Sequence, residues 1–186
     1  VHVVVIRAEG RGAFCAGAAL QELKAATPED ARTLRSQAVF SAIAASPAIT
    51  IAAVGGPAVA GGCELALACD LRLVGPAATF KLPETALGII PAAGGCTRLA
   101  RLVGSSVAKQ LILGGRTLSA QDALQLGLAL QLSEDVDQAA YALALQLAQR
   151  SPDALRMAKN IIDRASETES LEAERIAQAE LYALRG

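Results

Sequence analysis

The chain has 186 residues, enough for one domain with a sizeable core, and 53% of them are hydrophobic while only 3% are aromatic. The formal net charge is −1, which gives no overall attraction to nucleic acid or to an anionic membrane surface. No apolar run is long enough to predict a membrane-spanning helix. The core is therefore expected to be aliphatic and rich in alanine.

Cysteine and histidine usage argues against a metal site. The cysteines show no C-x-x-C spacing, and His2 is the only histidine in the chain. We therefore expect no metal ligands and interpret the cysteines as small, buried residues in a reducing compartment. They are Cys15, Cys63, Cys69 and Cys96.

The first half of the chain alternates strand-like and helical segments. Residues 1–7 are continuous and β-branched, as in a strand buried on both faces. Because the sequence starts directly on such a strand, we expect a further portion to precede it. Pro28 opens a helical repeat of apolar or small positions that reaches Ile43. Three more strands are predicted, over residues 50–54, 70–74 and 79–81. This rhythm indicates an α/β architecture with largely parallel strands.

From residues 94–95 onward, the sequence is predicted to be helical almost to its end. Helix starts with N-capping patterns are predicted at Ser119 with Asp122, at Ser151 with Pro152, and at Ser166 with Glu169. The last helix, over residues 168–184, is amphipathic, which is typical of a helix that covers a core edge or a neighbouring subunit. We therefore divide the chain into a strand-rich core, residues 1–118, and a helical region, residues 119–186.

Two glutamates beside glycine- and alanine-rich turns are the most informative residues. Glu64 ends the sequence Gly-Gly-Cys-Glu, and Glu84 follows Pro83. A carboxyl in a dry pocket, or beside a second carboxylate, has a raised pKa, so one of the pair could be protonated while the other acts as a base on a shared water. Taken singly, Glu64 could be a helix-dipole partner and Glu84 a surface residue or helix cap.

The turns near Glu64 could bind an oxygen that becomes negatively charged. A helix that begins at Gly61 presents unpaired backbone N–H groups, and residues 16–19 form a second turn of small residues after a strand. Two such N–H groups would form an oxyanion hole. The alternative is that these glycines only permit tight turns and close packing.

Other catalytic arrangements find little support. A serine–histidine triad would have to use His2, and no G-x-S-x-G sequence occurs. There is no P-loop and no G-x-G-x-x-G after a strand. Cys63 has no histidine to activate it and is interpreted as an apolar filler.

Three segments in the same order resemble one known family. Phe-Cys-Ala-Gly-Ala-Ala-Leu at residues 14–20 is similar to the first signature of the enoyl-CoA hydratase/isomerase (crotonase) family. Gly-Gly-Cys-Glu-Leu-Ala-Leu-Ala-Cys-Asp at 61–70 resembles its second signature, and residues 81–99 resemble its third. The resemblance implies an α/β fold: a crotonase-like spiral of ββα repeats, lacking its N-terminal portion, followed by a helical oligomerisation (trimerisation) region truncated at its C-terminus.

The resemblance also implies roles for particular residues. The N–H groups of Ala18 and Gly61 would bind the thioester oxygen of an acyl-CoA. The residue matching Glu64 helps to activate water, and the residue matching Glu84 gives or takes the proton at the α-carbon. Further substrate contacts are expected at Ala16, Gly62, Pro91 and Ala92.

The glutamate pair favours hydration of a trans-2-enoyl-CoA to a 3-hydroxyacyl-CoA, because family isomerases commonly keep only the second carboxylate. The similarity is to the hydratase branch that includes methylglutaconyl-CoA hydratase. Two alternatives stay open: an isomerase or other enolate-forming acyl-CoA enzyme, and an RNA-binding or assembly homologue. The stretch 20–34 contains a single lysine, Lys24, which argues against RNA binding.

The partners implied by the resemblance are an acyl-CoA substrate and further copies of the chain in a homotrimer or dimer of trimers. No metal or redox cofactor is implied, since coenzyme A is part of the substrate, and no membrane partner is expected. The expected compartment is the mitochondrial matrix or the bacterial cytoplasm.

The sequence departs from the family pattern near the expected site. Ala19 replaces a usual aspartate, Ala60 stands where a third glycine is common, and Ala92 replaces a usual glycine after Pro91. Cys96 and its neighbour replace the usual Thr-Gln. None of these changes removes an expected acid, base or N–H donor.

Overall fold

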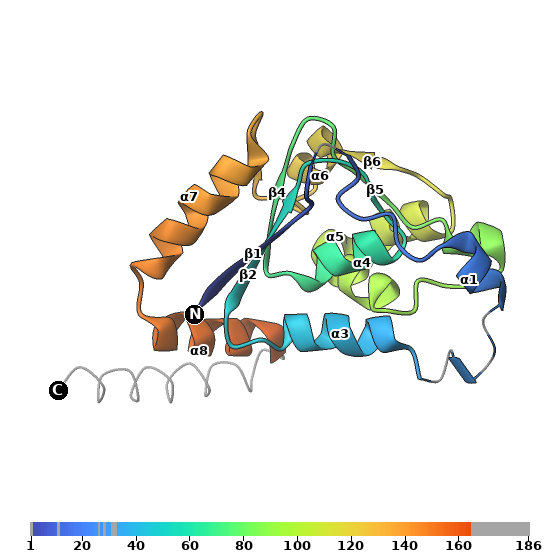
Figure 1. Cartoon of the computed structure of the whole chain (residues 1–186), viewed down its shortest axis with the longest axis horizontal. Coiled ribbons are helices and arrows are strands. Elements are labelled where there is room, and N and C mark those ends of the chain that lie inside the picture. Colours follow the sequence, from blue (N-terminus) through green and yellow to red (C-terminus); the bar gives the residue numbers. More distant parts are fainter. Residues whose placement is uncertain (1, 11, 26, 28, 31–32, 165–186) are drawn as a thin grey trace.

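A parallel four-stranded sheet forms the centre of the computed structural model, which describes residues 2–10, 12–25, 27, 29–30 and 33–164. Its strands lie in the order β1 (Val3–Arg7), β2 (Ile49–Val54), β4 (Leu71–Val74) and β7 (Gln131–Leu132). All three pairings between them are parallel. The predicted parallel α/β architecture is confirmed, and Figure 1 shows helices on both sides of the sheet.

The alternation of side chains along β2 builds two apolar layers. Ile49, Ile51 and Ala53 pack against one helix, α7 (Val136–Ala148). Ala52 and Val54 point to the other face, into a larger cluster with residues of α4 (Gly61–Ala68) and α5 (Gly95–Ile112). Every residue of β2 is buried, as its continuous apolar sequence predicts. The same prediction is wrong for residues 1–7, because β1 lies at the edge of the sheet, none of its residues is buried, and Val4 is exposed.

A second, three-stranded sheet lies beside the first. Its order is β3 (Ala58–Val59), β5 (Thr79–Lys81) and β6 (Leu118–Ser119). β6 pairs antiparallel with β5, and β7 joins the parallel sheet. The prediction of a helical chain after residue 95 is therefore wrong at these two short strands. Each has two residues, which is too short for a periodicity in the sequence to show.

The remaining helices are mostly short. They are α1 (Leu20–Ala25), the 3-10 helix η1 (Glu84–Leu87), α3 (Arg35–Ala44), α6 (Ala120–Gln125) and α8 (Pro152–Arg164). The helix predicted from Pro28 is interrupted: residues 29–30 are helical, Leu34 has non-helical backbone angles, and α3 begins at Arg35. Pro28 itself lies outside the described residues. No side chain of α3 is buried.

The capping predictions are confirmed where the structure describes them. Ser119 and Asp122 form a reciprocal capping box at α6. Ser151 Oγ accepts a hydrogen bond from Ala154 N, and Pro152 is the first residue of α8. The cap predicted at Ser166 and the last helix lie outside the described residues, and the division of the chain at residue 118 stays a prediction.

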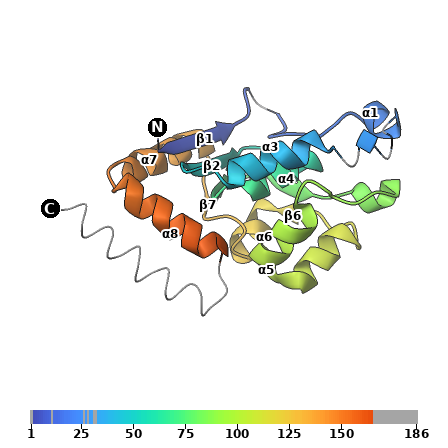
Figure 2. The same ribbon diagram turned by 90° about the horizontal axis from the view of Figure 1, so that it is seen from below.

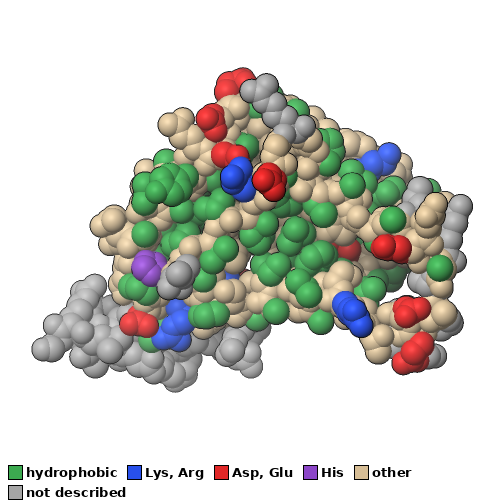
Figure 3. Space-filling view, viewed as in Figure 1, with side chains coloured by type: hydrophobic (Ala, Val, Ile, Leu, Met, Phe, Trp, Pro, Cys, Tyr) green, Lys and Arg blue, Asp and Glu red, His purple; other side chains and the backbone are tan. Residues whose placement is uncertain are grey.

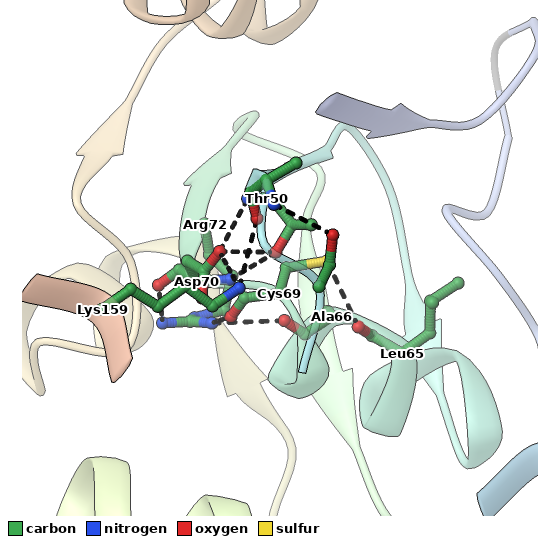
Figure 4. A network of polar contacts seen from close by, with 9 residues as sticks. Thr50, Leu65, Ala66, Cys69, Asp70, Arg72 and Lys159 are labelled. Atoms are coloured by element: carbon green, nitrogen blue, oxygen red, sulfur yellow. Dashed lines mark hydrogen bonds and ion pairs between the residues drawn. The ribbon is translucent and has the colours of Figure 1, made fainter. Parts of the chain in front are cut away.

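A polar network attaches α8 to the central sheet (Figure 4). Lys159 Nζ lies 2.9 Å from Asp70 Oδ2, and these side chains are only 6% and 18% exposed. The same carboxylate oxygen accepts hydrogen bonds from Thr50 N at 2.7 Å and from Thr50 Oγ1 at 2.9 Å. Lys159 also donates to Ala48 O. Arg72, buried beside it, donates to the carbonyl oxygens of four residues, namely Ala66, Cys69, Asp70 and Leu128.

Breaking this ion pair is expected to loosen α8. Replacing Lys159 by methionine keeps the aliphatic stem but leaves Asp70 charged, largely buried and short of one partner, so we expect a loss of about 2 kcal/mol in the free energy of unfolding. Urea denaturation measures the loss. Arg156→Met is the matched control, since it removes an exposed ion pair with Asp153 on the same helix and should cost less than about 0.5 kcal/mol. Equal effects of the two variants would contradict a special role for Lys159.

The surface carries many apolar side chains. Figure 3 shows them across the middle of one face, with charged side chains mostly nearer its edge. Eleven large hydrophobic side chains of the described residues are exposed, among them Leu113 at 70% and Ile162 at 73%. Of the helices that the structure describes, none combines the length and apolarity needed to cross a bilayer.

Candidate active site

The two turns expected to supply N–H donors lie side by side. Cys15 forms a parallel bridge with Ala58, and Val59 N donates to Cys15 O at 3.0 Å. This pairing brings the turn that follows Cys15 against the start of α4. A Cβ built on Gly17 would lie only 3.0 Å from Gly61 N. Because Gly17 also has a φ of +80°, glycine is required there both by the backbone and by the close approach.

The N–H groups of Ala18 and Gly61 are free to bind a ligand as far as the described residues go. Neither donates to a described group. Gly61 is the first residue of α4, so its N–H has no acceptor inside the helix, and it lies at the positive end of the helix dipole. Ala18 is exposed and Gly61 is half-buried. The two turns therefore lie close together, and the binding of one oxygen by the N–H groups of Ala18 and Gly61 stays a prediction.

The residue before Gly61 has a strained backbone. Ala60 is the only described non-glycine residue with positive φ, at φ 52° and ψ −124°. Hydrogen bonds hold it there: Ala60 N donates to Lys81 O at 2.9 Å, and Ala60 O accepts from Glu64 N at 3.0 Å. A backbone of this kind costs an alanine about 1–3 kcal/mol. A glycine, which is usual in the family at this position, would avoid that cost. Ala60 therefore lowers the stability of the fold.

We therefore expect Ala60→Gly to stabilise the protein. Relief of the strain should exceed the greater flexibility of glycine in the unfolded chain, for a net gain of about 1 kcal/mol in the free energy of unfolding. Urea denaturation measures this gain. The control, Ala66→Gly, lies inside the same helix with ordinary angles and should lose about 1 kcal/mol or more. A loss at both positions would show that Ala60 is not strained.

Glu64 is held by the start of another helix. Its side chain is on α4 and only 4% of the residue is exposed. Oε1 accepts hydrogen bonds from Ala93 N at 2.8 Å and from Gly95 N, the first residue of α5, at 2.9 Å. Burial raises the pKa of Glu64, while these two N–H groups and Arg98 lower it and so moderate the rise. Oε2 accepts no hydrogen bond from a described residue, which leaves it open to a water.

Glu84 has a different environment. It is the first residue of η1 and is 6% exposed. Its Oε2 is buried and has no hydrogen-bond partner among the described residues. Burial raises the pKa of Glu84 most strongly; its own backbone N–H opposes the rise, and the charge of Glu64 adds to it. A buried carboxyl oxygen without a hydrogen-bond partner is unfavourable for folding, so a functional role is the explanation to test.

The two environments push the glutamates toward different protonation states. Glu64 has two backbone donors that favour the carboxylate, whereas the unpartnered Glu84 is better suited to carry a proton. The charge of Glu64 also contributes to the raised pKa of Glu84. The pair therefore has the components of an acid and a base.

The sequence did not point to the partners of Glu64. Ala93 and Gly95 were not expected site residues, although the glycine pair at 94–95 is a signal for close packing. A Cβ on Gly95 would lie 3.0 Å from Glu64 Oε1 and 2.7 Å from Pro91 Cβ. Gly95 is therefore needed for Glu64 to reach the start of α5.

The expected substrate-contact residues occupy different settings. Pro91 is buried beside Gly95, and Ala92 is exposed while its carbonyl accepts a hydrogen bond from Gln37 Nε2 at 2.8 Å. Ala16 is exposed. Gly62 is buried against Cys15 O, which gives it a packing role. Contact of these four with a substrate stays a prediction.

The cysteines differ from one another. Cys63 and Cys69 are buried, as expected, and burial raises the pKa of both thiols, that of Cys69 to about 11. Such thiols are poor nucleophiles. Cys15 is half-buried and Cys96 is exposed, so the expectation of four buried cysteines is wrong for these two. Cys96 lies in the first turn of α5.

A cavity of about 930 Å³ lies at the carboxyl ends of β1, β2 and β4, where Gly55 and Gly75 line it, and neither glutamate is among its lining residues. Its acidic residues include Asp135, which caps α7, and Asp137, which pairs with Arg7 at 2.9 Å. Within the described residues, no group of three or more His, Cys, Asp or Glu side chains is placed to hold a metal ion.

Comparison with known proteins identifies relatives along nearly the whole chain. The family model for enoyl-CoA hydratase/isomerase matches residues 1–184. A probable mitochondrial enoyl-CoA hydratase 2 from Arabidopsis thaliana is 45% identical over 171 residues, covering 90% of this chain and 57% of that protein. Human mitochondrial methylglutaconyl-CoA hydratase is 42% identical over 178 residues, covering 91% of this chain and 52% of that protein. The chain thus spans little more than half the length of these curated relatives.

Solved structures share the fold. An enoyl-CoA hydratase from Bacillus anthracis has a TM-score of 0.90 and 37% identity, and the match covers 96% of this chain and 72% of that one. A putative enoyl-CoA hydratase from Thermobifida fusca in complex with CoA has a TM-score of 0.87 and 34% identity, covering 100% and 78%. With its paired sheets and helices, the chain has the crotonase fold and belongs to the enoyl-CoA hydratase/isomerase (crotonase) family.

Proposed function

We propose that the protein hydrates the α,β double bond of a trans-2-enoyl-CoA to give a 3-hydroxyacyl-CoA. The observation that carries the proposal is the asymmetric glutamate pair: Glu64 has two backbone donors on one oxygen, and Glu84 has a buried oxygen without a partner. Glu64 lies in the first turn of α4, where the N–H group of Gly61 has no described acceptor. Glu84 follows β5, which pairs with β3 just before α4. The names of the relatives, and the CoA in the Thermobifida fusca structure, support an acyl-CoA substrate.

In this reaction the N–H groups of Ala18 and Gly61 bind the thioester oxygen. They stabilise the negative charge that develops there as water attacks the β-carbon. Losing one donor of this kind typically raises a barrier by roughly 2.7–4 kcal/mol. Because both donors are backbone groups fixed by the pairing of Cys15 with Ala58, they need no rearrangement during the reaction.

The glutamates handle the protons of the added water. Glu64, as the carboxylate, takes one proton from water while the water oxygen forms its bond to the β-carbon. Glu84, as the neutral acid, gives its proton to the α-carbon, and the π electrons of the double bond form that new C–H bond. The product gains H and OH, and the proton taken by Glu64 must then return to Glu84 before the next turnover.

Product analysis tests the proposal. Incubation with crotonyl-CoA should give a product heavier by one water, with a hydroxyl group at the β-carbon. An unchanged mass with a shifted double bond, measured on a 3-enoyl-CoA, would identify an isomerase instead. If neither conversion occurs with the folded protein, the proposal is wrong.

We also propose a location and an assembly. The relatives from Arabidopsis thaliana and Homo sapiens are named as mitochondrial, and others are bacterial, which supports a mitochondrial matrix or a bacterial cytoplasm. A homotrimer, or a dimer of trimers, follows from the family resemblance. Sedimentation equilibrium measures the assembly, and a monomer at micromolar concentration would contradict it.

A further inference from the structure

The loop that leads into α5 and binds Glu64 is held in turn by two side chains. Gln37 Nε2, on α3, donates to Ala92 O at 2.8 Å. Arg98 Nη1, near the start of α5, donates to Ala93 O at 2.8 Å. α3 lies beside α4, the helix that carries Glu64 (Figure 2). The loop is therefore fixed both from α3 and from α5.

Gln37 acts on the same peptide group that donates to Glu64. The carbonyl of Ala92 and the N–H of Ala93 belong to one planar trans peptide group, in which the two bonds point in opposite directions. Gln37 binds the carbonyl end, and Glu64 Oε1 accepts from the N–H end at 2.8 Å. A donor on the carbonyl fixes the direction of the N–H and polarises it, because hydrogen bonds in a chain strengthen one another. Rotation of this peptide group would turn a carbonyl oxygen toward the carboxylate and would break both bonds.

Arg98 holds the next two carbonyls. Its side chain donates to Ala93 O, and its own N–H donates to Gly94 O at 2.8 Å. The Gly94 carbonyl shares a peptide group with the N–H of Gly95, which is the second donor to Glu64. Both peptide groups whose N–H binds the carboxylate are therefore held at their carbonyl end as well.

The position of the Arg98 side chain is unusual for a cation. It lies near the N-terminus of α5, where the helix dipole disfavours a positive charge. A Cβ on Gly94 would lie 1.9 Å from Arg98 Nη1, so the guanidinium lies directly against the Gly94 backbone, which has a φ of +110°. Arg98 Nη2 also donates to Ser41 Oγ on α3 at 3.4 Å. A glycine thus makes room for a guanidinium that joins the loop to α3.

We propose that Gln37 and Arg98 are positioning residues for Glu64: they keep two backbone N–H groups directed at its carboxylate, so that it can accept a proton from water. The proposal rests on the hydratase function proposed above. Burial raises the pKa of Glu64, whereas its two N–H donors and the charge of Arg98 oppose that rise. Loss of either positioning residue should therefore raise the pKa of Glu64 further. The thiols of Cys63 and Cys96 are affected by the charge of Glu64, but burial above all raises their pKa, so they stay neutral while a carboxyl titrates.

Carbon-13 NMR of the Glu64 carboxyl tests the proposal without any substrate. The glutamate carboxyl carbons are labelled, and the signal of Glu64 is assigned by its absence from Glu64→Gln. Because the charges of Glu64 and Glu84 interact, the titrations are done in the Glu84→Gln background. We expect the midpoint of the Glu64 titration to move to higher pH in Gln37→Leu and in Arg98→Met. An unmoved midpoint in both variants would overturn the proposal.

Hydration kinetics provide a second measurement. Gln37→Leu should lower kcat about fivefold, the usual effect of one neutral hydrogen bond, and Arg98→Met about ten- to a hundredfold, because its hydrogen bonds are charged. The acidic limb of the kcat/KM profile should move to higher pH in both variants, while KM changes little. Val39→Ala and Arg101→Met are the matched controls, since they change exposed residues of the same two helices. Both controls should leave kcat and the acidic limb unchanged.

The outcomes separate this proposal from the proposed function. Hydration with a kcat and an acidic limb that neither variant moves would leave the hydratase function standing and contradict the positioning role. Lower stability with an unmoved Glu64 titration would show a purely structural role and would also contradict it. If the unmodified protein hydrates no enoyl-CoA, the proposed function is wrong, and the titration still decides whether Gln37 and Arg98 position Glu64. Should Arg98→Met fail to fold, Gln37→Leu changes an exposed side chain and keeps the test decisive.

Discussion

Replacing Glu84 by glutamine is expected to lower kcat for hydration by about 10²–10⁴-fold, the usual contribution of a general acid. Glutamine has the same shape and can donate a hydrogen bond, but it cannot deliver a proton to the α-carbon. KM should change little, because Glu84 Oε2 makes no hydrogen bond with the described residues that the substitution would break. Steady-state kinetics with crotonyl-CoA measures both quantities. A variant with undiminished kcat would remove Glu84 from the mechanism.

The same substitution should stabilise the fold. Because burial and the charge of Glu64 raise the folded-state pKa of Glu84, the folded protein binds more protons than the unfolded chain between the ordinary carboxyl pKa and the raised one. Glu84 therefore destabilises the fold at neutral pH, and this penalty disappears as the pH falls through the raised pKa. Thermal unfolding of Glu84→Gln should show a higher Tm at pH 8, with an advantage that shrinks toward pH 4. A lower Tm at pH 8 would contradict this sign.

The second large effect concerns Gly62. Alanine at this position is expected to destabilise the protein by more than about 3 kcal/mol or to prevent folding. Its Cβ would lie 1.9 Å from Cys15 O and 2.5 Å from Cys15 C, and both are backbone atoms. To relieve the clash, the segment of Cys15 must move away from α4, which also separates the N–H groups of Ala18 and Gly61. The free energy of unfolding, measured by urea denaturation, and the rate of hydration should therefore fall together.

The neighbouring glycine gives a matched control. A Cβ on Gly61 would meet only Gly17 Cα, at the ordinary contact distance of 3.7 Å. Gly61→Ala is therefore expected to change the free energy of unfolding by less than about 1 kcal/mol, with the gain in helix propensity offsetting any crowding. Equal destabilisation by the two alanines would show that the packing of Cys15 on α4 is not the reason for the glycine pair.

Much of the fold could be predicted because local signals and buried patterns agree. The apolar run of β2 predicts a strand covered on both faces, and these faces are filled by α7 and by α4 with α5. The capping box of Ser119 could also be predicted, because it involves only residues that are close in the sequence. The two-residue strands β6 and β7 could not be predicted, since they form only by pairing with distant segments. Gly104 has non-helical backbone angles inside α5. This break could not be predicted either, because a lone glycine inside a helical pattern is usually tolerated.

Only part of the candidate site could be predicted from the sequence. Both glutamates and both small-residue turns could be named from the sequence, because unusual residues beside glycines are local signals. What distinguishes Glu64 from Glu84 is not local. The donors to Glu64 come from residues 93 and 95, about thirty positions further along the chain, and the isolation of Glu84 Oε2 is a property of packing.

A double-mutant cycle on the two glutamates tests the central claim most directly. The rate of crotonyl-CoA hydration would be measured for the unmodified protein, Glu64→Gln, Glu84→Gln and the double variant. If both carboxyls act on one water and one substrate, removing either should disable the step, and the double variant should be little slower than the slower single variant. Losses that multiply, so that each glutamate contributes independently of the other, would contradict the shared acid–base pair.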